Sequence, residues 1–126
     1  MTDSALSSAQ RTLATEIDGL QALSDALGDN FEQAVTKLAE ISGRVIVSGM
    51  GKSGHIGSKI AATMASTGTP AQFVHPGEAS HGDLGMITSN DAVLALSWSG
   101  ETAELANLID YAKRFSIPLI ALTSGA

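Results

Sequence analysis

The chain has 126 residues, 44% of them hydrophobic, no cysteine and a formal net charge of −6. This length suits one domain with a core of its own, and the lack of cysteine excludes a disulfide framework and thiol chemistry. Only seven Lys and Arg residues oppose thirteen acidic residues, so no nucleic-acid partner is expected. The N-terminus lacks a basic and apolar leader pattern, and no run approaches the ~18 apolar residues of a membrane span. We therefore expect a cytoplasmic protein with no membrane partner.

Two helices are predicted before residue 44. Apolar residues recur near helical spacing over residues 5–27, and Gly28 is placed as a left-handed C-terminal cap. A second helix is predicted from residue 29 or 30 until Gly43 stops it. Its apolar stripe consists of Phe31, Val35, Leu38 and Ile41.

From residue 44 onward the pattern alternates between strands and helices. This alternation predicts right-handed crossovers and a mostly parallel sheet covered on both faces. The last strand, PLIALTS, is apolar, and no helix follows it, which is typical of a fragment of a larger domain. Strands are predicted at 44–49, 71–75, 91–100 and 118–124, helices at 55–67 and 101–115, and a loop at 76–90.

The segment VSGMGKSGHIG, residues 47–57, joins the first strand to the following helix. Its glycines at 49, 51 and 54 match the dinucleotide-binding pattern, which also requires an acid at the end of the second strand. That strand, AQFVH, ends in Val74 and His75, so the acid is missing. The triphosphate-binding P-loop requires glycine where Ile46 stands, so a nucleoside triphosphate is not expected either.

A simpler anion site remains after these exclusions. Backbone N–H groups at a helix N-terminus bind anions, with Lys52 as a point charge and Ser53 as a hydroxyl donor. The alternative is that the glycines only let strand and helix pack closely, with a solvated lysine.

A second strand-to-helix segment, LSWSGET at residues 96–102, offers three hydroxyls, those of Ser97, Ser99 and Thr102. In a sheet ordered 2-1-3-4, the first and third strands are neighbours where the winding reverses, and ligands bind at that point. Ordinary helix caps would explain either segment alone. Both segments together favour a phosphate group as the ligand.

The run GMGKSGHIGSKIAATMASTGTPAQFVHPGEASHGDLGMI, followed by LSWSGETAEL, resembles the SIS (sugar isomerase) domain of bacterial D-arabinose 5-phosphate isomerases over about residues 35–126. The resemblance implies a three-layer α/β/α sandwich with a flavodoxin-like sheet, as one SIS domain over residues 1–126 that is truncated after the fourth strand. Helices occupy residues 1–43 of it and an αβ core residues 44–126. The implied activity converts D-arabinose 5-phosphate to and from D-ribulose 5-phosphate, feeding 3-deoxy-D-manno-octulosonate for lipopolysaccharide. Trp98 departs from related domains, which often carry an amide at this position.

The resemblance also implies catalytic residues. Aldose–ketose isomerisation moves a proton through an enediolate, so it needs a base, an electrophile and a phosphate anchor but no redox cofactor. Lys52 matches a lysine implicated in catalysis, with simple phosphate pairing as its alternative. Glu104 matches a catalytic glutamate, although a carboxylate in the first turn of a helix is also explained by the helix dipole.

The loop HPGEASHGDLG brings two histidines and two acids together within nine residues, a weak metal signal that a turn-rich active-site loop explains better. By resemblance, His75 and His81 contact the sugar, and His75 is where an inhibitory zinc ion would bind. Gly68 and Thr69 match a substrate-contacting turn, although a plain loop before Pro70 explains them equally well.

Two other function classes remain open: a sugar-phosphate-binding SIS domain without catalysis, and a nicotinamide-dependent enzyme supported only by the glycine spacing. A homo-oligomer is expected, with a small sugar phosphate as ligand. The 126-residue chain itself is expected to bind sugar phosphate poorly, to lack activity and to associate through its last strand, burying Leu119, Ile120 and Leu122.

Overall fold

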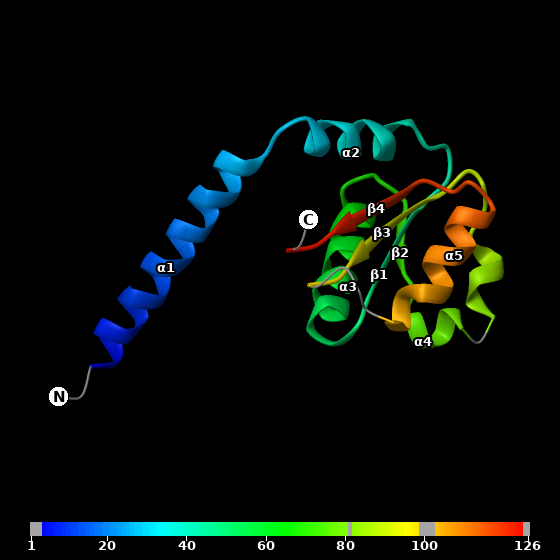
Figure 1. The fold of residues 1–126 in the computed structure, drawn as a ribbon. Helices are drawn as coiled ribbons and strands as arrows, with labels where there is room; N and C mark the ends of the chain where they lie inside the picture. The colour runs from blue at the N-terminus through cyan, green and yellow to red at the C-terminus, as the bar shows by residue number, and fades with distance from the viewer. Residues whose placement is uncertain (1–3, 81, 99–102, 125–126) are drawn as a thin grey trace. The chain divides into compact units, whose positions relative to one another are not determined.

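The computed structural model of the chain describes residues 4–80, 82–98 and 103–124 (Figure 1). It forms two compact units, residues 1–33 and residues 34–126. Within the described ranges, none of the helices combines the length and the apolar character that a membrane crossing requires.

The first unit contains α1 (Ala5–Ala26) and the start of α2 (Asp29–Glu40). The Ser4 side chain caps α1 by accepting a 3.0 Å hydrogen bond from the backbone N–H of Ser7. None of the residues of α1 is buried, so its predicted apolar stripe is exposed. The predicted residues with their large side chains in solvent are Leu13, Ile17, Leu20 and Leu23, together with Leu27 directly after the helix.

The prediction that Gly28 caps α1 in the left-handed conformation is wrong. Leu27 is the C-cap, with extended φ −65° and ψ 137°, and its N–H donates to the Leu23 carbonyl. Gly28 serves the next helix instead, because its carbonyl accepts the N–H of Phe31 at 3.0 Å in the first turn of α2. Only one residue separates Leu27 from α2, so this position starts a helix and does not end one.

The second unit is built on four parallel strands in the order β2-β1-β3-β4. The order and the parallel pairing are as predicted. Val47 on β1 pairs with Phe73 on β2 and with Leu94 on β3, and Leu94 pairs with Ile120 on β4. The strands are β1 (Val45–Gly49), β2 (Ala71–Phe73), β3 (Ala92–Leu96) and β4 (Leu119–Leu122).

Helices cover both faces of this sheet, which gives the expected three-layer α/β/α sandwich (Figure 1). Alternate strand residues face α3 (Gly51–Ser66), among them Val45, Val47, Leu94 and Leu96, with Leu38 and Ile41 packed against the same cluster. The residues between them face the layer that holds α4 (Pro76–Ala79) and α5 (Ala106–Arg114). These buried strand residues are Ile46, Val93 and Ala95.

Several boundaries differ from the sequence prediction, and the clearest differences lie on either side of the first and third strands. α2 ends at Glu40, three residues before Gly43, because Gly43 donates its N–H to the Asn90 carbonyl at 2.8 Å. A side chain at Gly43 would collide with the carboxylate of Asp91, so the chain needs glycine here for close approach and not to stop a helix. The predicted loop at 76–90 contains α4 and the 3₁₀ helix η1 (Asp83–Met86).

Candidate functional site

The glycine-rich segment is a tight strand-to-helix junction and not a long loop. Met50 alone separates β1 from α3, which begins at Gly51, four residues before the predicted start. Gly51 has φ +57°, a value that side-chain-bearing residues rarely adopt. A Cβ on Gly54 would lie 2.6 Å from the Gly49 carbonyl oxygen. Gly49 and Gly54 therefore let the strand and the helix pack closely, as the alternative prediction stated.

This packing places Lys52 and Ser53 in the first turn of α3, beside the carboxyl end of β1. The first backbone N–H groups of a helix have no acceptor within it, and Met50 supplies no side-chain cap. The Gly54 N–H donates to the Met50 carbonyl at 3.2 Å. The junction therefore presents polar N–H groups together with a lysine.

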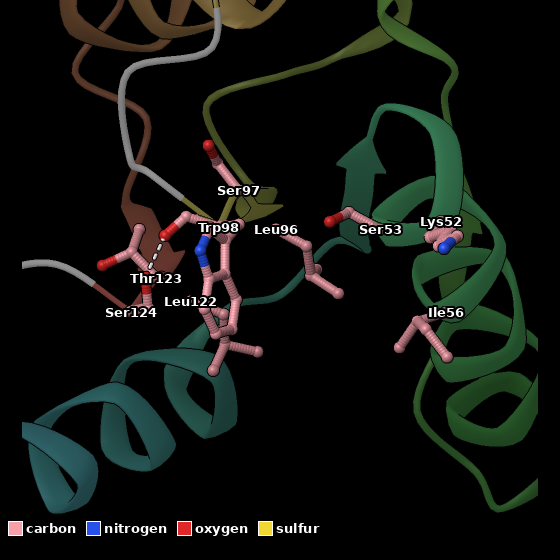
Figure 2. Close-up of a pocket in the computed structure, with 9 residues that line it drawn as sticks. All are labelled: Lys52, Ser53, Ile56, Leu96, Ser97, Trp98, Leu122, Thr123 and Ser124. Carbon is pink, nitrogen blue, oxygen red and sulfur yellow. Dashed lines mark hydrogen bonds between the residues drawn. The ribbon is translucent and has the colours of Figure 1, made fainter.

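A pocket of about 370 Å³ opens at this edge of the sheet (Figure 2). α3 forms one wall, and the ends of β3 and β4 form the other. Figure 2 shows Lys52, Ser53 and Ile56 on the α3 side, across from the residues that follow β3 and β4. The pocket is lined by Lys52, Ser53, Ile56, Leu96, Ser97, Trp98, Leu122, Thr123 and Ser124.

The wall opposite α3 is fixed by backbone pairing that continues past the strands. Ser97 N–H donates to the Leu122 carbonyl at 3.0 Å. The Trp98 carbonyl accepts the N–H of Ser124 at 3.0 Å and its hydroxyl at 2.5 Å (Figure 2). Ser97 is buried, and Trp98 is exposed. The β3–β4 ladder thus carries both residues to the pocket on a fixed backbone.

The described lining of the pocket is positively charged. Lys52 is its only charged side chain, and it lies exposed at the N-terminal end of a 16-residue helix. Helix N-termini carry partial positive charge that favours anions. Because Ser53 and Ser97 add hydroxyl groups in the same lining, this edge of the sheet is suited to a small polar anion.

The structure thus brings three of the predicted site residues together: Lys52, Ser53 and Ser97. Sequence reasoning did not assign a binding role to Ile56, Leu122, Thr123 or Ser124. Their place in the predicted sheet could have indicated this role. Leu122 ends the fourth strand and pairs with Leu96 at the end of the third, so both reach the same edge. For Trp98 the sequence showed only a departure from the amide that related domains often carry, whereas the structure makes it a wall of the pocket.

His75 lies at the same edge, after β2, but outside the described lining of this pocket. It is the N-cap of α4, and its Nδ1 accepts a 3.0 Å hydrogen bond from the Gly77 N–H. In the ranges with described placement, no group of three or more His, Asp or Glu side chains could hold a metal ion. His81 lies outside the described residues, and zinc binding at His75 stays a prediction.

Gly68 and Thr69 are not brought to the pocket. They follow the far end of α3, whose 16 residues span about 24 Å from the turn that carries Lys52. Gly68 has φ +103°, and the Thr69 N–H donates to the Met64 carbonyl at 2.9 Å, which is the geometry of a helix C-terminal cap. The two residues thus form a turn at the opposite edge of the sheet, outside the described lining of this pocket, and their substrate contact stays a prediction.

The remaining predicted site residues lie on the segments that follow β2 and β3. His81, Ser99 and Thr102 lie outside the described residues. The backbone of Glu104 lies in the 3₁₀ helix η2 (Ala103–Leu105), on the segment that leads from β3 to α5. Glu104 thus follows the strand that borders the pocket.

The family assignment follows from comparison with known proteins. The profile of the SIS domain matches residues 37–126. The chain belongs to the SIS domain family. The arabinose 5-phosphate isomerase KdsD of Pseudomonas aeruginosa is 58% identical over 118 residues, 94% of this chain and 36% of that protein. The chain therefore spans about a third of the length of this curated relative.

Two solved structures show the same SIS domain fold. An Escherichia coli CFT073 protein in complex with A5P is 39% identical, with a TM-score of 0.87 over 98% of this chain and 66% of that chain. The NanR protein of Vibrio vulnificus, complexed with ManNAc-6P, is 20% identical, with a TM-score of 0.78 over 91% of this chain and 44% of that chain. At this low identity the second likeness shows the fold alone.

Proposed function

We propose that the protein is a sugar-phosphate aldose–ketose isomerase that interconverts D-arabinose 5-phosphate and D-ribulose 5-phosphate. The observation that carries this proposal is the gathering of Lys52, Ser53 and Ser97 around one pocket at the carboxyl ends of β1 and β3. The relative named arabinose 5-phosphate isomerase, 58% identical, supports the choice of substrate.

The reaction moves one proton between neighbouring carbons. A base removes the proton from C2 of the aldose, the C–H electrons form the C1–C2 double bond, and the C1 carbonyl oxygen becomes an enediolate oxygen. Return of the proton to C1, with transfer of the O2 proton to O1, produces the ketose. The net reaction needs no electron acceptor, so we expect no redox cofactor.

We assign Lys52 to the enediolate oxygen. The exposed ammonium group of Lys52 can stabilise a negative oxygen or pass a proton to it. We assign Glu104 to proton transfer because the segment that carries it leaves the end of β3 beside the pocket. Ser53 and Ser97, together with Ser99 and Thr102 on the β3–α5 segment, are assigned to the phosphate, which binds best to hydroxyl and N–H donors. His75 and His81 remain proposed sugar contacts from the neighbouring β2 end.

A binding domain without catalysis would fit the same pocket, since the SIS fold is also found in a protein complexed with ManNAc-6P. The two functions differ in turnover and not in ligand class. A nicotinamide enzyme is less well supported, because close packing accounts for Gly49 and Gly54 and the residues at the end of β2 include no acid.

The test is a parallel titration of the chain with D-arabinose 5-phosphate, D-arabinose and NAD, followed by NMR shifts of the backbone amides. We expect only the sugar phosphate to bind, with the largest shifts at Lys52, Ser53 and Ser97. Tighter binding of NAD, or equal binding of the unphosphorylated sugar, would contradict the proposal. A ketose-formation assay on the chain and on the full-length gene product then separates an isomerase from a binding domain.

A further inference from the structure

Trp98 is exposed to an unusual degree for a large apolar side chain. Its exposed fraction is 81%, whereas the other exposed large hydrophobic side chains in the described part of the chain range from 48% to 68%. It also lines the pocket at the end of β3. An exposed indole at the wall of a cavity offers a large apolar surface to a ligand.

The position of Trp98 follows from strand alternation. Leu94 and Leu96 lie on the face of β3 that packs under α3, and they are only 6% and 8% exposed. Trp98 is the next residue of the same row, because side chains on one face of a strand recur every second residue. α3 begins at Gly51, and its first turn lines the pocket opposite Trp98. The apolar row thus continues out of the core and becomes a wall of the pocket.

This wall is held by its backbone. The Trp98 carbonyl accepts two hydrogen bonds from Ser124, at 3.0 Å from the N–H and 2.5 Å from the hydroxyl. An indole on a fixed backbone has only two side-chain torsions to restrict, so it offers a large contact area at a small entropic cost.

The pocket has two chemically different parts. Lys52 and Ser53 supply a cation and a hydroxyl, whereas Ile56, Trp98 and Leu122 supply apolar surface (Figure 2). A sugar phosphate has the same division, with a dianion at one end and a chain of C–H groups along its carbons. A pocket that bound phosphate alone would have no use for the apolar wall.

We propose that Trp98 is a specificity-determining residue, against which the carbon chain of a sugar phosphate packs. Lys52 and Ser53 alone would bind inorganic phosphate as well as they bind the phosphate group of a sugar. Contact with Trp98 adds affinity only for the sugar phosphate. The inference rests on the proposed function and extends it, because it assigns selection for the sugar to an apolar contact and selection for the phosphate to the α3 junction.

The first test uses the intrinsic fluorescence of the protein. Trp98 is the only tryptophan of the chain, so its emission reports on this pocket alone. D-arabinose 5-phosphate is expected to shift the emission to shorter wavelength, because contact with the carbon chain removes water from the indole. Inorganic phosphate at saturating concentration is expected to leave the emission unchanged. An equal shift with both ligands would overturn the inference.

The second test measures affinity by calorimetry. Trp98→Ala is expected to weaken binding of D-arabinose 5-phosphate at least about fivefold, and Trp98→Phe to keep most of the affinity. Both variants should bind inorganic phosphate within about twofold of the unmodified chain. Phe115→Leu is the matched control, since it alters another exposed aromatic residue, at the end of α5, and should change neither affinity.

The outcomes separate this inference from the proposed function. If neither the chain nor the full-length gene product binds D-arabinose 5-phosphate, the proposed function fails, and the inference fails with it. If the chain binds it and Trp98→Ala binds it equally well, only the inference fails. Loss of phosphate binding in Trp98→Ala would also overturn it, because the indole would then act on the anion site. A changed oligomeric state by light scattering with unchanged affinity would make Trp98 an interface residue.

Discussion

The hydroxyl of Ser48 donates a 2.6 Å hydrogen bond to the backbone carbonyl of Val74, and both residues are buried. The Val74 N–H in turn donates to the Val47 carbonyl at 2.8 Å. These two bonds join the ends of β1 and β2 at the edge where the pocket opens. His75 follows directly, so Ser48 also fixes the start of the proposed sugar-contact loop.

Removing this hydroxyl should destabilise the protein. Ser48→Ala leaves the buried Val74 carbonyl without its donor, which typically costs about 1–3 kcal/mol of unfolding free energy. Urea denaturation with an unchanged m-value would measure the loss.

Ser66→Ala is the control for this prediction, since the Ser66 hydroxyl bonds the Thr63 carbonyl on the exposed end of α3. It should change stability by no more than about 0.5 kcal/mol. If Ser48→Ala shifts the urea midpoint no more than Ser66→Ala does, the hydrogen bond to Val74 contributes nothing to stability.

The contact between Gly54 and Gly49 predicts a second stability effect. In Gly54→Ala the new Cβ would lie 2.6 Å from a backbone oxygen that no rotamer change can move, so α3 must shift away from β1. We expect a loss of about 1–3 kcal/mol in denaturant unfolding. Gly19→Ala, on α1 with nothing within 4 Å, makes the same chemical change without a collision and should not lower stability. Equal stability of the two variants would contradict the close-packing explanation.

The fold was predictable because the apolar residues after residue 44 follow two patterns: short continuous runs, which indicate buried strands, and residues at helical spacing, which indicate helices. Runs such as VIV and AVLAL predicted buried strands, and the β2-β1-β3-β4 order is confirmed. The early start of α3 was not predictable from periodicity, since its first turn contains glycine, lysine and serine and no apolar residue. Gly51 with φ +57° starts the helix there, and a left-handed glycine leaves no hydrophobic signal.

The site was predictable where it follows from strand ends. Lys52, Ser53 and Ser97 come directly after the carboxyl ends of β1 and β3, which are neighbours in the sheet, and they share the pocket. The pocket role of Leu122 was missed because a leucine in a strand pattern is typical of core. The predicted substrate contact of Gly68 and Thr69 came from the resemblance alone, and α3 separates these two residues from Lys52.

The end of α5 makes a third prediction about stability. Ser116 has φ +55°, and the N–H groups of Ile117 and Ser116 donate to the carbonyls of Ala112 and Lys113, at 2.8 and 3.4 Å. This is the cap that Gly68 forms at the end of α3. Serine is strained in this conformation, so Ser116→Gly should raise stability by about 0.5–1 kcal/mol after glycine's entropic cost.

Thermal denaturation of three variants would check this prediction. Ser116→Gly should raise the midpoint, whereas Ser116→Val should lower it, because a β-branched residue tolerates positive φ least. Gly68→Ala is the reverse change at the matching position of α3. It should lower the midpoint and reduce the unfolding free energy by about 1 kcal/mol. A lower midpoint for Ser116→Gly would show that the serine hydroxyl contributes more than the strain costs.

Catalysis is predicted to depend on Lys52 through the reacting oxygen and not only through the phosphate. Lys52→Met keeps most of the length of the side chain and removes its charge, so kcat in the full-length gene product should fall at least about a hundredfold, with far-UV circular dichroism unchanged. Lys59→Met removes the same charge from an exposed position of α3 outside the pocket lining and should leave kcat within about twofold. An increase in KM with unchanged kcat for Lys52→Met would instead make the lysine a phosphate anchor, because binding lost equally from substrate and transition state does not slow the chemical step.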